Sequence, residues 1–483
     1  MEIVNTKLIS LINSFTPGEI EQFKKFISSP FFSKGRNYLP FLEHVLKISS
    51  NSIIKKYQNR LKPDSGKKFS EQTLRNRYSE LYKLGEEFLI YTGLNENRSE
   101  KEKLLLKKLI DKKLYVHFNI RHKESVSILM KEKYDNRKFK DLSSLTELNF
   151  RLLHDKNKPD QIYSEYYETS KTALCLDLID LFEYGYEFAQ QEFDNRKFEP
   201  NYILVFLKKL NIEEIIKEFL NSDQIIFKVT ALNYYLYKAF ENEDIEEYYF
   251  KSHKIFTELF TGLKDDYKVK IFNHMINYCI RKRNKGVLKY EQNLFDLYNE
   301  KLNQNLISDL KANNYLFNYF RDYVLIGISI KNYSWVENFI AEYSLELPPE
   351  IREDETRISY AKLYFAKRKF EKSLLNLQNI KTTYYLLYMD SSALRLCIYF
   401  EQCRYEDAFL ELDRLKHYLR NHKEIPKVHL NTIENFIRIY NVLLKYITNP
   451  EKTDIGFLEK DMNSFPLITN RKWLMEKIGE IQF

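Results

Sequence analysis

Apolar residues recur at helical spacing along most of the 483-residue chain. The clearest stripe begins after Ser70, where apolar residues are separated by three or four positions and therefore share one face of an α-helix. Its members are Leu74, Tyr78, Leu81, Leu84, Phe88 and Tyr91. With Ser70 as the N-cap and Gly93 as the stop, this stripe predicts one long helix.

Capping signals and shorter apolar patterns place further helices in the first 97 residues. Thr16 can cap a helix that begins at Pro17, and Glu19 completes a capping box. Two more helices are expected at 38–48 and 53–61. Residues 1–97 are therefore predicted to form a four-helix N-terminal unit.

The pattern stays helical but is less regular between residues 98 and 220. Leu104 to Ile110 begins one helix, and others are expected at 120–134, 142–154, 162–194 with an internal break, and 202–220. We therefore predict an irregular helical region over 98–220.

The clearest internal repeat lies nearer the C-terminus. Residues 360–377 align with residues 395–412, each as a helix, a tight turn and an aromatic-x-x-small step into a second helix. The aromatic residue of the first helix is Tyr364 or Tyr399, and the small residue is Ser373 or Ala408. A third copy has Gly327 and Val336 at these two positions, and it ends on Pro348-Pro349.

These features resemble the tetratricopeptide repeat, in which helical hairpins stack into an α-solenoid. The resemblance covers 221–447, and residues 448–483 are expected to form C-terminal capping helices. It implies a groove lined by first-helix side chains such as Asn233, Asn277 and Arg395, which takes an extended peptide or a partner helix. Over its whole length the chain is also similar to uncharacterised bacterial helical-repeat proteins, a likeness that implies no function.

Composition agrees with an all-α fold, because glycine and proline number only 11 each. The four cysteines, Cys175, Cys279, Cys397 and Cys403, form no C-x-x-C pair and are expected to be reduced and mostly buried. The N-terminus lacks a signal-peptide pattern, and no apolar stretch is long enough to span a membrane. We therefore expect a cytoplasmic protein without membrane contact.

Charge is unevenly distributed along the chain. Residues 1–140 contain 29 Lys and Arg against 16 Asp and Glu, whereas the whole chain has a net charge of only +8. This excess suggests that the N-terminal unit contacts an acidic partner or nucleic acid. The candidate contact residues are Lys67, Lys68, Arg75, Arg77 and Lys83. Glutamates of the same helix, such as Glu71 and Glu80, could instead neutralise them.

Recognisable catalytic and cofactor motifs are absent from the sequence. The two closest glycines, Gly85 and Gly93, are eight positions apart, so no phosphate-binding glycine loop can form. No histidine is followed by glutamate, which excludes an H-E-x-x-H metal motif. One helical face carries Asp177, Asp180, Glu183 and Glu187, which we interpret as a solvated or partner-docking face rather than a cation site.

The expected function is accordingly a scaffold or adaptor for protein–protein interaction, with no catalysis, metal or cofactor and with a protein or peptide partner of unidentified sequence. The alternative is a regulator with a nucleic-acid-binding N-terminal unit and a repeat domain that senses a peptide or a protein.

Overall fold

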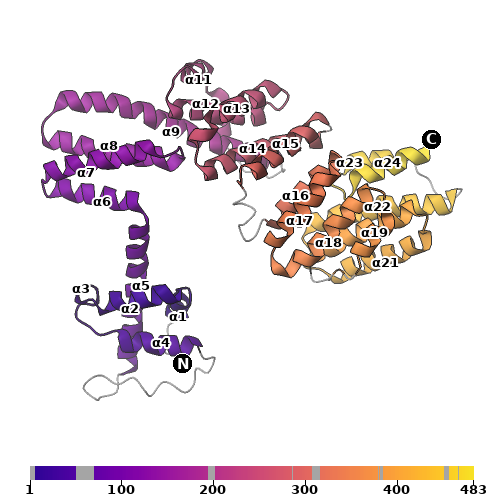
Figure 1. Ribbon diagram of the computed structural model, residues 1–483, viewed down its shortest axis with the longest axis horizontal. Helices are drawn as coiled ribbons and strands as arrows, with labels where there is room; N and C mark the ends of the chain where they lie inside the picture. Colours follow the sequence, from indigo (N-terminus) through magenta and orange to yellow (C-terminus); the bar gives the residue numbers. More distant parts are fainter. Residues whose placement is uncertain are drawn as a thin grey trace. The chain divides into compact units, whose positions relative to one another are not determined.

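The computed structural model describes residues 6–50, 70–193, 202–285, 287–306, 316–378, 380, 384–450, 456–465 and 467–482. Over these ranges the chain is built from α-helices, with two single 3-10 turns and one isolated β-bridge, and no β-strand forms (Figure 1). The all-α prediction is therefore confirmed. In the same ranges, no helix is both long enough and apolar enough to cross a membrane.

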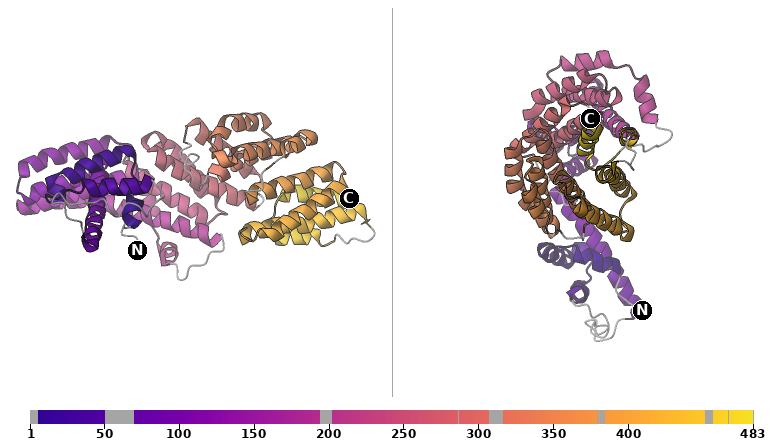
Figure 2. Two further views of the ribbon diagram at one scale, coloured as in Figure 1. Left: turned by 90° about the horizontal axis from the view of Figure 1, so that it is seen from below. Right: turned by 90° about the vertical axis from the view of Figure 1, so that its right-hand side faces the viewer.

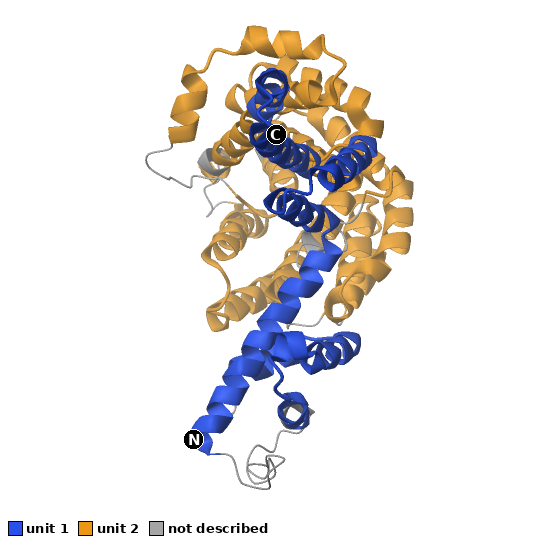
Figure 3. Cartoon of the chain, turned by 90° about the vertical axis from the view of Figure 1, so that its left-hand side faces the viewer, with its two compact units in different colours: residues 1–132, 136–176 blue, residues 133–135, 177–483 orange. Residues whose placement is uncertain are grey.

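The chain divides into two compact units (Figure 3). Unit 1 comprises residues 1–132 and 136–176, and unit 2 comprises residues 133–135 and 177–483. The division falls inside α9 (Pro159–Phe193), a single uninterrupted helix of 35 residues. The predicted break within 162–194 is therefore wrong, because no proline or glycine pair interrupts the backbone hydrogen bonds of this helix.

Unit 1 contains eight helices in the described ranges, in addition to the first part of α9. They are α1 (Thr6–Asn13), α2 (Pro17–Ser28), α3 (Pro30–Ser33), α4 (Leu39–Ser50), α5 (Glu71–Glu96), α6 (Arg98–Asp111), α7 (Tyr115–Lys131) and α8 (Asn136–Asp155). Helices α1 and α3 were not predicted, and the expected helix at 53–61 lies outside the described residues. The remaining helices of the first 97 residues occur close to their predicted positions.

The capping signals of unit 1 act as predicted at helix starts. The backbone N–H of Thr16 donates to Glu19 Oε2 at 2.7 Å, and Thr16 Oγ1 accepts from the backbone N–H of Glu19, which completes the capping box of α2. Ser70 Oγ accepts from the backbone N–H of Thr73 at the start of α5. The expected stop at Gly93 is wrong, because α5 continues to Glu96 and only one residue separates it from α6.

Unit 1 has two separate hydrophobic cores. The first joins the apolar stripe of α5, including Tyr78 and Phe88, to aromatic residues of the preceding helices such as Phe23. The second lies among α6, α7 and α8 and is smaller. Its buried members are Leu106, Ile110, Phe118, Leu129, Leu145, Leu152 and Leu153.

Unit 2 contains the rest of α9 and fifteen further helices in the described ranges. They are α10 (Tyr202–Lys209), α11 (Glu213–Leu220), α12 (Ile225–Glu241), α13 (Glu246–Leu259), α14 (Asp265–Asn284), α15 (Lys289–Asn303), α16 (Leu316–Ser329), α17 (Tyr333–Tyr343), α18 (Pro349–Ala366), α19 (Phe370–Asn376), α20 (Tyr385–Glu401), α21 (Tyr405–Asn421), α22 (Lys427–Thr448), α23 (Leu458–Ser464) and α24 (Arg471–Gln482). The predicted single helix at 202–220 is divided into α10 and α11.

Consecutive helices of unit 2 pack in pairs, which the views of Figure 2 also show. The pairs are α12–α13, α14–α15, α16–α17, α18–α19 and α20–α21. Each of the last three pairs also contacts the helix that follows it, α18, α20 or α22. The two hairpins predicted at 356–380 and 390–418 are present as α18–α19 and α20–α21.

The same turn closes three of these hairpins. Lys331, Arg368 and Cys403 have positive φ angles of 61°, 55° and 57°. The backbone N–H of the next residue then donates to the carbonyl five positions earlier, on Gly327, Tyr364 or Tyr399, at 2.8–2.9 Å. This bond satisfies a helix C-terminal carbonyl, as in a Schellman motif. The three acceptors occupy the aligned first-helix position of the sequence repeat.

Small residues allow close packing in these hairpins. Ala408, the small residue of the second sequence repeat, is fully buried in the core that α20, α21 and α22 share. In the α16–α17 hairpin the small residue lies on the first helix instead. A Cβ atom at Gly327 would lie only 2.5 Å from Cγ2 of Val336. Gly327 therefore compensates for the larger Val336, and the departure from the repeat pattern has a steric reason.

Candidate functional site

The basic residues singled out in the sequence are partly neutralised by neighbouring acids of α5. Arg75 pairs with Glu71 at 2.5 Å, and Arg77 pairs with Glu80 at 3.0 Å. Glu80 also accepts hydrogen bonds from Tyr38 and Arg36, which lower the pKa of its carboxyl although partial burial opposes the shift. Lys83 is exposed on α5, whereas Lys67 and Lys68 lie outside the described residues.

The acidic face of α9 is engaged with α14. Glu183 pairs with Lys270 at 2.5 Å, and partial burial raises the pKa of Glu187 although Lys270 opposes the shift. No group of three or more His, Cys, Asp and Glu side chains within the described part of the chain is placed to hold a metal ion. This face of α9 is therefore paired within unit 2 at Glu183 and exposed at Asp177.

The three residues expected to line a groove are held by interhelical hydrogen bonds. Asn233 is buried and donates to Tyr267 Oη at 2.8 Å. Asn277 donates to Tyr186 Oη at 3.0 Å. Arg395 donates to a carboxylate oxygen of Glu411 at 2.9 Å and to the carbonyl of Leu377 at 3.2 Å. All three side chains connect helices, and Arg395 also lines an open space.

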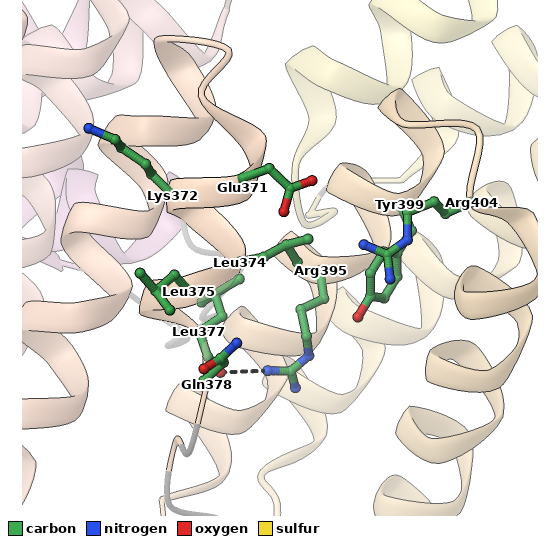
Figure 4. Close-up of a pocket in the computed structure, with 9 residues that line it drawn as sticks. All are labelled: Glu371, Lys372, Leu374, Leu375, Leu377, Gln378, Arg395, Tyr399 and Arg404. Carbon is green, nitrogen blue, oxygen red and sulfur yellow. Dashed lines mark hydrogen bonds between the residues drawn. The ribbon is translucent and has the colours of Figure 1, made fainter.

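That open space is a cleft of about 600 Å³ beside α19 and α20. Figure 4 shows the nine residues that line it, with the hydrogen bond from Arg395 to the end of α19. They are Glu371, Lys372, Leu374, Leu375, Leu377, Gln378, Arg395, Tyr399 and Arg404. One side of the cleft comes from α19, a helix of only 7 residues, and the other from α20 and the turn that follows it.

Local contacts position the side chains on the Arg395 side of the cleft. Arg395 donates to the carbonyl of Leu377 at the C-terminal end of α19, where a cation is favoured by the helix dipole. The Arg404 guanidinium lies 4.8 Å from the ring centroid of Tyr399 and donates to Asp407 at 2.8 Å. Partial burial raises the pKa of Tyr399. These contacts keep a tyrosine ring and two guanidinium groups at fixed places in the wall.

Exposed charged and apolar side chains form the other side of the cleft. Leu375 is 63% exposed on α19, and Lys372 is exposed one turn away. Glu371 accepts a hydrogen bond from Gln402 at 2.7 Å. The described lining thus offers three cations, one carboxylate and a cluster of leucines. It contains no serine, cysteine or histidine.

A second group of charged residues crosses the first helices of three successive hairpins. Arg321 of α16 donates twice to Glu355 of α18, at 2.8 and 2.9 Å, and also pairs with Asp390 of α20 at 3.1 Å. Lys362 pairs with the same Asp390 oxygen at 3.0 Å. Glu355 is fully buried. These four groups satisfy one another, and they join α16, α18 and α20 rather than offering an open site.

Sequence reasoning named Arg395 but missed the remaining cleft residues. The cleft lies between α19 and α20, and no local sequence pattern specifies how these two helices pack. Comparisons with models of protein families, with curated proteins and with solved structures find no match.

Proposed function

We propose that this protein is a scaffold or adaptor for protein–protein interaction, in which stacked hairpins of unit 2 form an α-solenoid of the tetratricopeptide type. Its partner would supply a peptide segment to the cleft beside α19. The observation that carries this proposal is the cleft itself, a hollow of about 600 Å³ in a series of hairpins that share one turn.

The packing of the hairpins supports a solenoid. The first helices contact each other from α16 to α18, from α18 to α20 and from α20 to α22, and each second helix also contacts the next first helix. A hairpin that touches only its neighbours in this way is the unit from which helical solenoids are built. Such arrays present long surfaces that accommodate extended peptides or helices.

The lining of the cleft supports peptide binding. Lys372 provides an exposed cation, and Arg404 provides a partly exposed guanidinium although it also pairs with Asp407. Leu374 and Leu375 provide apolar surface. Because Arg395 already binds Glu411 and Leu377, it would act chiefly as a rigid wall. An extended segment with an acidic side chain next to an apolar one matches this arrangement.

A peptide-display selection on the full chain tests the proposal. The selected peptides are then measured by fluorescence anisotropy against the wild type and against the Lys372→Glu/Arg404→Glu double variant. We expect enrichment of acidic peptides, and an affinity loss of about tenfold or more in the variant, because two attractive charges become repulsive.

A matched control is the Lys254→Glu/Lys423→Glu variant, which makes the same change in net charge at exposed positions outside the cleft lining. It should bind the selected peptides like the wild type. Equal affinities for all three proteins, or a selection without enrichment, would contradict the proposal.

A further inference from the structure

The α6–α7 hairpin has several large apolar side chains that are exposed rather than packed into its small core. Val116 is 70% exposed and Ile120 is 55% exposed, both on α7. Further exposed apolar residues of this hairpin are Leu104, Leu105, Leu114, Ile128 and Met130. Isolated exposed apolar residues are ordinary, but a concentration of them on one hairpin indicates an interaction surface.

The same hairpin carries positive charge that its own acids do not neutralise. Its four carboxylates are already paired, since Glu100 binds Lys103, Glu102 and Glu124 bind Arg121, and Asp111 binds Arg151. Other lysines of the hairpin are exposed and form no ion pair with any residue that the structure describes. They are Lys101, Lys107, Lys108, Lys112, Lys113, Lys123 and Lys131.

Apolar and cationic side chains alternate on the outward faces of both helices. On α7, Val116, Ile120 and Lys123 follow at helical spacing, on the side opposite the buried Phe118 and Leu129. On α6, Lys101, Leu104 and Lys108 repeat the arrangement opposite the buried Leu106. The outward face of each helix is therefore both apolar and positively charged, and the two kinds of side chain are interleaved along it.

We propose that the α6–α7 hairpin docks an amphipathic acidic segment of a partner protein, in which Asp or Glu alternates with large apolar residues. The unpaired lysines would complement the acids, and Val116 and Ile120 would be covered by the apolar side chains. This site lies in unit 1 and does not depend on the cleft of unit 2.

The mixture of side chains favours this occupant over three others. A second copy of the hairpin would bring the same positive charge and be repelled. Nucleic acid would neutralise the lysines but would gain nothing from covering Val116 and Ile120. A membrane-surface helix keeps its apolar residues on a separate face, whereas Lys123 shares the outward face of Ile120.

Binding of a synthetic amphipathic peptide, with interleaved leucine and glutamate, to the full chain tests the proposal. Two variants separate its two components, Val116→Ser/Ile120→Ser for the apolar part and Lys108→Glu/Lys123→Glu for the charge. We expect each variant to weaken peptide binding by about tenfold or more in isothermal titration calorimetry, because the segment needs both contacts. Thermal melting followed by circular dichroism verifies that both variants fold.

Control variants at other sites and competing ligands test whether another surface or another class of partner explains the binding. The Leu410→Ser/Lys254→Glu variant makes the same kinds of change at exposed positions of unit 2 and should bind the peptide normally. The Lys372→Glu/Arg404→Glu variant should also bind it, which distinguishes this site from the cleft. An apolar variant with unaltered peptide affinity would overturn the proposal. Tighter binding of duplex DNA or of phosphatidylserine vesicles than of the peptide would overturn it as well.

Discussion

The α6–α7 hairpin of unit 1 and the α20–α21 hairpin of unit 2 are closed by the same turn but are covered very differently. Lys113 and Cys403 both adopt positive φ angles, 60° and 57°. In each, the next backbone N–H returns to a carbonyl five positions earlier at 2.8 Å, from Leu114 to Leu109 and from Arg404 to Tyr399. The backbone conformation and hydrogen bonding of the two turns are therefore the same.

The neighbours of the two hairpins account for the difference. The α20–α21 hairpin is packed between α18–α19 and α22, and its Arg395 is paired across the hairpin with Glu411. The α6–α7 hairpin packs on α5 and α8 and leaves Val116 and Ile120 exposed. The comparison teaches that a hairpin motif predicts a turn and a core face, whereas the number of neighbours determines whether the outward face is structural or available for a partner.

The largest expected effect comes from breaking the buried charges that join the unit 2 hairpins. Arg321→Met leaves the fully buried Glu355 without its main partner and should lower the free energy of unfolding by about 3 kcal/mol. Urea denaturation measures this change. The Arg321→Met/Glu355→Leu double variant should recover part of the loss of stability, because the buried Glu355 carboxylate is then no longer left unpaired.

The comparison variant lies in the α6–α7 hairpin. Glu124→Ala removes an exposed ion pair and should lower the free energy of unfolding by less than about 1 kcal/mol. Equal losses of stability in Arg321→Met and Glu124→Ala would contradict the contrast between the buried and the exposed ion pair.

Overpacking should also separate the two hairpins. Ala408→Leu adds volume at a fully buried site and should lower the free energy of unfolding by about 1–3 kcal/mol. The matched change in α7, Ser127→Leu, adds the same kind of side chain at an exposed position. It should alter stability by less than about 0.5 kcal/mol. An unchanged melting temperature for Ala408→Leu would show that the helices of this hairpin are packed differently.

A buried histidine should make unit 2 sensitive to acid. Burial lowers the pKa of His274 to about 3, and the nearby charge of Lys270 acts in the same direction. The unfolded chain therefore binds a proton near the ordinary value of 6.5 that the folded chain does not bind. The stabilising contribution is complete above that value and is lost progressively as the pH falls towards the folded-state pKa.

Urea denaturation at neutral and mildly acidic pH measures this dependence. His274→Phe should be less destabilised by acid than the wild type, since the variant has no proton to exclude at this site. His117→Phe, at an exposed position of α7, should retain the wild-type dependence. If both variants responded to pH alike, His274 would not be the source of the acid sensitivity.

The smallest expected effect concerns what the two hairpins share. Cys403→Gly and Lys113→Gly relieve a side chain from a left-handed backbone conformation, although glycine also loses more conformational entropy on folding. Both variants should change stability by less than about 1 kcal/mol and by similar amounts in urea denaturation. A large loss at one position only would show that the two turns are not equivalent.

The sequence by itself determined the helical class, the start of α2 and of α5, and the register of the α18–α19 and α20–α21 hairpins. These features depend on interactions within a few residues, such as the capping of Glu19 by Thr16, and such interactions can be read from spacing. The same local reasoning failed at Gly93, because a single glycine costs a helix only about 1 kcal/mol, and α5 continues through it to Glu96.

Only the tertiary structure decided which charged and apolar side chains remain available. Arg75 is matched by an acid of its own helix, and Arg395 by one on the neighbouring helix. Exposed lysines of α6–α7 such as Lys108 and Lys123, in contrast, form no ion pair with a described residue. The cleft beside α19 likewise needs α20 to form its second wall. Exposure and ion pairing depend on residues that are distant in the chain, and their positions follow from packing among helices rather than from the periodicity of any one helix.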